Sequence, residues 1–149
     1  MYLLSEFEKL NTGIDYKVSK KMQLDFVIRL IKKLMERNIT DAGLARMLED
    51  LLRMAVDYSE GREPGLRYYR KQKSVITNHV LKNHGLVYKG YYTALYMSLG
   101  LIFGSALGTI LMATGNTALY ATGVGPGLAI GVAIGAAKEK QADKEGKIY

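Results

Sequence analysis

The sequence predicts an all-α fold, with a cytoplasmic three-helix bundle followed by an antiparallel two-helix transmembrane hairpin. Three observations lead to this fold. Apolar residues recur at helical spacing in three segments before residue 85, no Asp, Glu, Lys or Arg lies between Gly90 and Ala137, and glycines recur every fourth residue inside that uncharged region. The predicted divisions are a cytoplasmic helical domain at 1–89, a glycine-rich transmembrane hairpin at 90–137 and a charged cytoplasmic tail at 138–149.

Composition excludes several kinds of site. The chain has 149 residues, a formal net charge of +7 and no cysteine, so it has neither a disulfide framework nor a thiolate metal site or nucleophile. The first eight residues include Glu6 and Glu8 and contain no apolar run, which does not match a secretory signal peptide.

Three amphipathic segments make up the predicted bundle, after a weakly patterned stretch at residues 1–18. In the first segment, residues 20–37, the apolar side chains at helical spacing are Leu24, Val27, Ile28, Ile31, Leu34 and Met35. Thr40 is the expected N-cap of a second helix that reaches about residue 60. The third helix is expected to begin at Pro64, run to about His84 and stop at Gly85. Three such helices with short links are typical of a small bundle.

Two uncharged stretches are long enough to cross a membrane. Residues 91–113 form a helix of roughly 35 Å at 1.5 Å per residue, which exceeds a hydrocarbon core of about 30 Å. Residues 118–137 are also sufficient, and the link at 114–117 carries no charge. Lys82 and Lys89 precede the spans and Lys138 and Lys140 follow them, so the positive-inside rule places both ends in the cytoplasm, with the chain in the cell (inner) membrane.

Glycine spacing predicts close packing of the two spans. The glycines are Gly100, Gly104 and Gly108 in the first span, and Gly123, Gly127, Gly131 and Gly135 in the second. Spacing by four places each set on one helical face, and glycine lets helix backbones approach each other in lipid. Two interpretations stay open: the two faces pack on each other within one chain, or they join copies of the protein.

Pro126 is the other irregular feature of the second span. It lacks a backbone donor and its ring clashes with the carbonyl of Thr122, so we expect a kink or a broken turn.

Basic and aromatic residues flank the first span. Between residues 66 and 89 there is no acidic residue, and the expected contacts with lipid headgroups are Arg67, Arg70, Lys71, Lys73, Lys82, Lys89, Tyr88, Tyr91 and Tyr92. Attraction to anionic lipid is favoured because the segment adjoins the span. A DNA-binding helix is the less favoured alternative, and a solvated face without a partner is the third.

No catalytic residue, metal site or cofactor is predicted. His79 and His84 are five residues apart, so on a helix they point about 140° apart and make a poor metal pair. The glycines of the second span lack the strand and lysine of a phosphate-binding loop. These features do not indicate an enzyme.

The C-terminal part resembles a group of membrane proteins. The run Gly127-Leu-Ala-Ile-Gly-Val-Ala-Ile-Gly-Ala-Ala-Lys-Glu-Lys, continuing into Lys144-Glu-Gly-Lys-Ile, is similar to the end of small uncharacterised prokaryotic glycine-zipper membrane proteins. The resemblance covers about residues 90–149 and implies a membrane location and a hairpin, without an activity.

The predicted function is that of an integral membrane scaffold or anchor. It would self-associate into a homo-oligomer through its glycine-packed helices, contact anionic headgroups through its basic juxtamembrane helix, and bind no small-molecule substrate. The alternatives are an oligomeric channel or membrane-perturbing effector gated by the cytoplasmic domain, and a membrane-tethered DNA-binding regulator.

Overall fold

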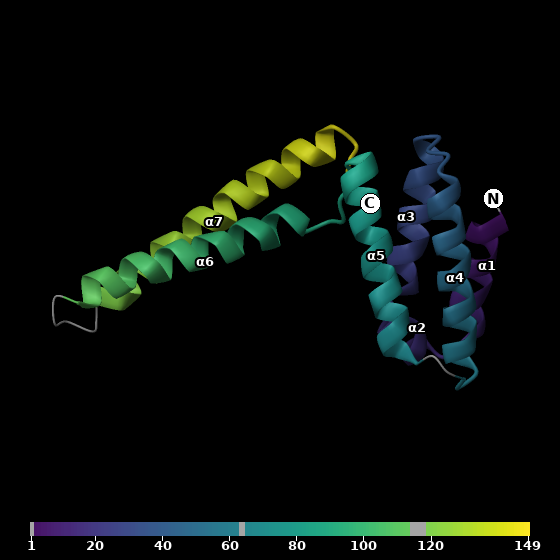
Figure 1. The fold of residues 1–149 in the computed structure, drawn as a ribbon. Coiled ribbons are helices and arrows are strands. Elements are labelled where there is room, and N and C mark those ends of the chain that lie inside the picture. Colours follow the sequence, from purple (N-terminus) through teal and green to yellow (C-terminus); the bar gives the residue numbers. More distant parts are fainter. Residues whose placement is uncertain (1, 63–64, 114–118) are drawn as a thin grey trace. The chain divides into compact units, whose positions relative to one another are not determined.

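The computed structural model describes residues 2–62, 65–113 and 119–149, which form seven helices and no strand (Figure 1). The all-α class is therefore confirmed for the described part. The chain divides into two compact units, Met1–Val87 with Tyr149, and Tyr88–Ile148.

The first unit contains five helices where the sequence predicted three. They are α1 (Tyr2–Gly13), α2 (Tyr16–Met22), α3 (Leu24–Glu36), α4 (Ala42–Ser59) and α5 (Leu66–His84). The weakly patterned N-terminal stretch is helical, and the predicted helix at 20–37 is divided at Gln23. That residue adopts a left-handed conformation with φ of 58°, which ends α2 and precedes α3. The three-helix prediction was wrong because a glutamine gives no sequence signal for such a break.

Local signals set the ends of α4 and α5. The cap of α4 is Asp41, not Thr40 as predicted: the Asp41 carboxylate accepts a hydrogen bond from the Leu44 N–H at 3.0 Å. Helix α5 ends at Gly85 as predicted, with φ of 64° in the left-handed region. The predicted start at Pro64 lies outside the described residues.

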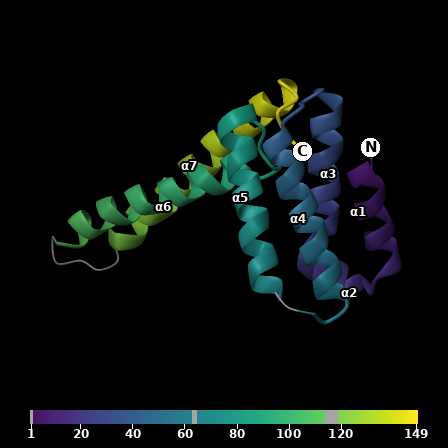
Figure 2. The ribbon, with the colours of Figure 1, turned by 45° about the vertical axis from the view of Figure 1, so that its right-hand side comes forward.

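The core of the first unit joins all five helices. Helix α4 packs on α5, α1 on α3 and α4, and α2 on α3 and α5 (Figures 1 and 2). Most of the apolar face predicted for α3 is buried, from Leu24 to Leu34, whereas Met35 is 42% exposed. The largest fully buried side chains are Tyr69, Phe7, Met22, Leu24, Leu30 and Leu51.

The second unit is an antiparallel pair of long helices, α6 (Tyr91–Met112) and α7 (Leu119–Lys144). Helix α7 extends beyond Ala137, so most of the predicted tail continues the helix. It also runs through Pro126 without ending there, and the expected broken turn is absent from α7 as described. The link predicted at 114–117 lies outside the described residues.

Candidate functional site

The two helices of the second unit meet backbone to backbone. A Cβ added to any of six glycines would lie less than 3.0 Å from the backbone of the opposite helix; these are Gly100, Gly104, Gly123, Gly127, Gly131 and Gly135. The backbone of Gly108 lies opposite Gly123, with its nitrogen 2.5 Å from such an added Cβ. All seven glycines singled out in the sequence therefore lie at the contact between α6 and α7.

This contact bears on the two interpretations of the glycine faces. In the structure each face packs on the other within one chain, although Gly100 and Gly127 also border a groove along the pair. Gly125 is different, since an added Cβ there meets nothing within 4 Å.

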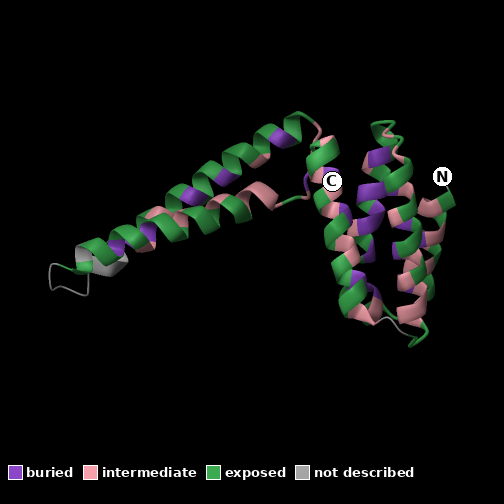
Figure 3. Ribbon diagram, viewed as in Figure 1, coloured by how far each residue is buried: buried purple, intermediate pink, exposed green. Residues whose placement is uncertain are grey.

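The outer surface of this helix pair is strongly apolar. Figure 3 shows that most of both helices is exposed, and the exposed residues include Ile102 (62%), Phe103 (68%), Leu107 (59%), Ile110 (68%) and Ile130 (60%). Within the described residues one helix is long and apolar enough to cross a membrane, over Tyr91–Ile110 with a mean hydropathy of 1.5. This finding hints at a membrane location. The second span and the topology stay predictions.

A carboxylate from α7 caps the start of α6. One oxygen of Glu139 accepts a hydrogen bond from the Gly90 N–H; the other accepts from the Thr93 N–H at 3.3 Å and the Thr93 hydroxyl at 3.4 Å. Helix N-termini leave amide donors unsatisfied, and a negative charge there also suits the helix dipole. Sequence reasoning missed this residue. An antiparallel alignment of the glycines would have predicted it. Gly135 lies against Thr93, so Glu139, one turn later on α7, lies near Gly90.

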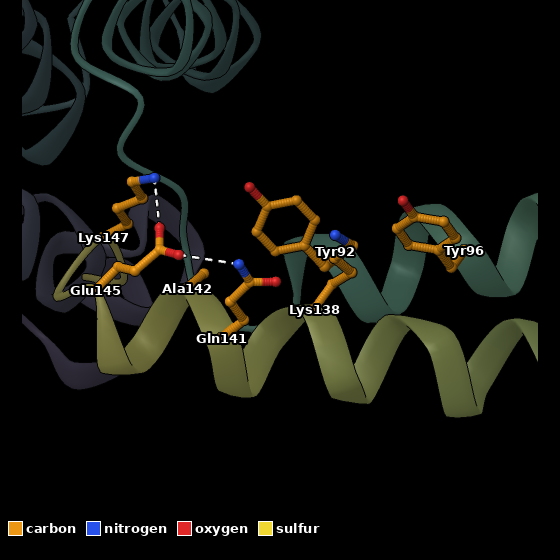
Figure 4. A pocket seen from close by; sticks show the side chains of 7 residues that line it. All are labelled: Tyr92, Tyr96, Lys138, Gln141, Ala142, Glu145 and Lys147. Atoms are coloured by element: carbon orange, nitrogen blue, oxygen red, sulfur yellow. Dashed lines mark hydrogen bonds and ion pairs between the residues drawn. The ribbon is translucent and has the colours of Figure 1, made fainter.

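A polar pocket lies beside that cap. Tyr92 and Tyr96 come from α6, and Lys138, Gln141, Ala142 and Glu145 from α7, with Lys147 beyond the helix end (Figure 4). The volume of the pocket is about 270 Å³. The carboxylate in this pocket belongs to Glu145 and has partners within the chain. It forms an ion pair with Lys147 at 2.5 Å and accepts a hydrogen bond from the Gln141 side-chain amide at 3.0 Å. These two contacts hold the pKa of Glu145 below its ordinary value. Two tyrosines and two lysines around such a pocket are typical of the headgroup level of a membrane.

The predicted headgroup contacts fall in both units. On α5 and after it, Arg67, Arg70, Lys71, Lys82 and Lys89 are exposed. Tyr88, Tyr91 and Tyr92 are half-buried and stack edge to face, with ring centroids 5.5 Å and 5.2 Å apart in the two successive pairs.

Lys73 does not share the exposure of the other basic residues. Its ammonium group donates to the Gln23 side chain and lies 5.3 Å from the centre of the Phe26 ring. Burial, and secondarily the charge of Arg70, lowers the pKa of Lys73. The side chain is therefore half-buried and engaged within the first unit, and its role as a lipid contact stays a prediction.

The two histidines also differ from expectation. Both ring Nε2 atoms converge on one oxygen of Asp41, so the interpretation that His79 and His84 point apart was wrong. Histidine, cysteine, aspartate and glutamate side chains can bind metal ions. Among the described residues, one group of three or more of them lies close enough together to hold an ion, and it consists of Asp41, His79 and His84.

Comparisons with protein-family models, with curated proteins and with solved structures gave no match. The resemblance to glycine-zipper membrane proteins therefore stays an expectation from the sequence.

Proposed function

We propose that this chain is a non-enzymatic membrane anchor or scaffold, in which α6 and α7 cross the bilayer as a hairpin and the first unit lies in the cytoplasm. The observation that carries the proposal is the combination of a backbone-to-backbone glycine contact with an apolar outer surface. Soluble monomers rarely expose contiguous apolar surface on this scale, whereas lipid covers it without cost.

Polar groups at one end of the pair support the same arrangement. The apolar part of α6 begins at the same end of the pair at which the apolar part of α7 ends. The polar residues at this end are Tyr92, Tyr96, Lys138 and Glu139. We place this end at the cytoplasmic headgroups, because lysines flanking spans favour the cytoplasmic side and tyrosines favour the interface. The exposed basic residues of α5 would add attraction to anionic lipid.

We also propose that copies of the chain associate, through a surface other than the glycine faces. Since the glycine faces are used within one chain, copies would meet through outward side chains. A groove of about 540 Å³ along the pair offers such a surface, lined in part by Phe103, Leu107, Pro126 and Ile130. Native mass spectrometry of the detergent-extracted chain at several concentrations tests this; a monomer throughout would remove self-association and leave the anchor intact.

Topology can be tested directly because the chain has no cysteine. Single substitutions Ser5→Cys, Asn116→Cys and Lys147→Cys give one reporter in each predicted compartment. In intact spheroplasts a membrane-impermeant maleimide should label only Asn116→Cys, and in inside-out vesicles only the other two. Release of the protein from membranes by alkaline carbonate, or equal labelling of all three in spheroplasts, would contradict the proposal.

A further inference from the structure

Three metal-ligating side chains meet at one end of the first unit. The Nε2 atom of His79 lies 2.8 Å from Asp41 Oδ2, and the Nε2 atom of His84 lies 3.1 Å from the same oxygen. The ligand atoms of all three residues lie within 4.8 Å of one another. This cluster belongs to the first unit and is independent of the proposed membrane hairpin.

Helix ends bring these groups together. Asp41 caps α4, and its Oδ1 atom accepts from the Leu44 N–H, which turns Oδ2 toward the histidines. His79 lies in the last turns of α5 and His84 is its final residue, just before the left-handed Gly85. Because α4 packs on α5, one carboxylate oxygen lies within reach of both rings despite their separation on the helix.

The spacing is close to that around a tetrahedral metal. Ligand atoms bound at about 2.0–2.1 Å to a tetrahedral zinc ion lie about 3.3 Å apart. The two distances to Asp41 Oδ2, 2.8 Å and 3.1 Å, are somewhat shorter, and all the ligand atoms lie within 4.8 Å of one another, so small side-chain movements would admit the ion. The side chains of His79, His84 and Asp41 are 23%, 19% and 21% exposed, so the cluster is sheltered but open to one solvent ligand. Two imidazoles with one carboxylate favour zinc-like ions over magnesium or calcium, which prefer oxygen ligands alone.

A neighbouring group already orients one of the ligands. The backbone N–H of Leu44 holds the carboxylate of Asp41 at 3.0 Å, so the orientation of this ligand is fixed before a metal binds. Outer hydrogen bonds of this kind fix the orientation of metal ligands and raise affinity.

We propose that Asp41, His79 and His84 form a binding site for a divalent transition-metal ion of the zinc type, with water as a fourth ligand. The ion would join the start of α4 to the end of α5. Such a site adds metal binding to the anchor function and does not depend on it.

Titration calorimetry of the full-length, tag-free chain in detergent tests the site, with ZnCl₂ alone as the probe. We expect one ion per chain with a dissociation constant in the micromolar range or below. The variants Asp41→Asn, His79→Gln and His84→Gln should each weaken binding by about 100-fold or more, beyond the roughly 10–100-fold effect of outer groups. Asp41→Asn keeps a capping side chain. Asp15→Asn is the matched control, because Asp15 caps α2 in the same manner away from any histidine, and it should bind as the unaltered chain does.

A second measurement needs no variant. The chain has two histidines, so modification by diethylpyrocarbonate can be assigned to each by mass spectrometry. Zinc should protect both rings together, and cobalt in its place should give visible absorption bands of a low-coordinate site. Absence of one-site zinc binding, or unchanged histidine modification at saturating zinc, would overturn the proposal whether or not the variants fold.

Discussion

The tightest prediction concerns two glycines that flank Pro126 on the same helix. A Cβ at Gly127 would lie 2.5 Å from the Gly100 carbonyl oxygen and 2.6 Å from the Gly104 Cα, whereas a Cβ at Gly125 meets nothing within 4 Å. Ordinary van der Waals contact with a Cβ lies at 3.4–4 Å, so Gly127→Ala must move the helices apart by about 1 Å. A gap of this size removes about a quarter to a half of the van der Waals attraction between the atoms on its two sides.

The expected free energies follow from two opposing terms. Overpacking costs about 1–3 kcal/mol, and alanine in place of a helical glycine returns about 1 kcal/mol. Gly127→Ala should therefore destabilise the pair by up to about 2 kcal/mol, whereas Gly125→Ala keeps only the gain of about 1 kcal/mol.

The assay is SDS titration of the reconstituted chain, read by energy transfer between dyes on cysteines introduced at Ser98 and Ala133. The transition should shift to lower SDS for Gly127→Ala and remain or rise for Gly125→Ala. Its midpoint should not depend on protein concentration, because the contact lies within one chain. Equal shifts for both variants would refute the packing argument, and a concentration-dependent shift would assign the glycine faces to contacts between copies.

Further predictions test three other sites, each followed in full-length protein in detergent or nanodiscs. Glu139→Ala should destabilise the helix pair by about 1–3 kcal/mol in the same SDS assay, because the start of α6 loses its acceptors, and Glu139→Gln should cost less; equal costs would show that an acceptor is not what matters. Tyr69→Phe should raise thermal stability by up to about 1 kcal/mol, because its buried hydroxyl has no hydrogen-bond partner in the described structure; a loss of stability would reveal one. Burial also raises the pKa of Tyr69, so ionisation favours the unfolded chain above about pH 10, and the advantage of Tyr69→Phe should grow there in pH-dependent melting curves. Replacing neutral by anionic lipid in nanodiscs should protect the exposed Lys71 from acetylation but leave Lys73 unchanged, and mass spectrometry that finds equal protection would show that Lys73 is not held by Gln23.

Sequence reasoning succeeded in long segments where apolar residues or glycines recur at helical spacing. The apolar face from Leu24 to Leu34 and the glycine series depend only on spacing along a helix, and both faces lie where that spacing predicts. It failed at Gln23, because a left-handed glutamine between α2 and α3 carries neither the glycine nor the proline signal of a break. It also failed at Asp41, because only the packing of α4 on α5 brings a cap within reach of two histidines.

Glycine spacing leaves the alignment of the two helices ambiguous, and the acidic residue that caps α6 differs between the alternatives. Three glycines on α6 face four on α7, so a slip by four residues that sets Gly108 beside Gly127 still places every glycine of α6 against glycines of α7. The hydroxyls of the first span do not distinguish the two alignments either, because Ser98, Ser105 and Thr109 donate to carbonyls of their own helix. The bonds of Glu139 to Gly90 and Thr93 form in the observed alignment, and in the slipped alignment the shorter Asp143 would take the place of Glu139. Removing the Glu139 carboxylate should therefore favour the alignment with Asp143 at the start of α6 as well as lower stability, and cysteine cross-links offset by four residues would reveal that alignment.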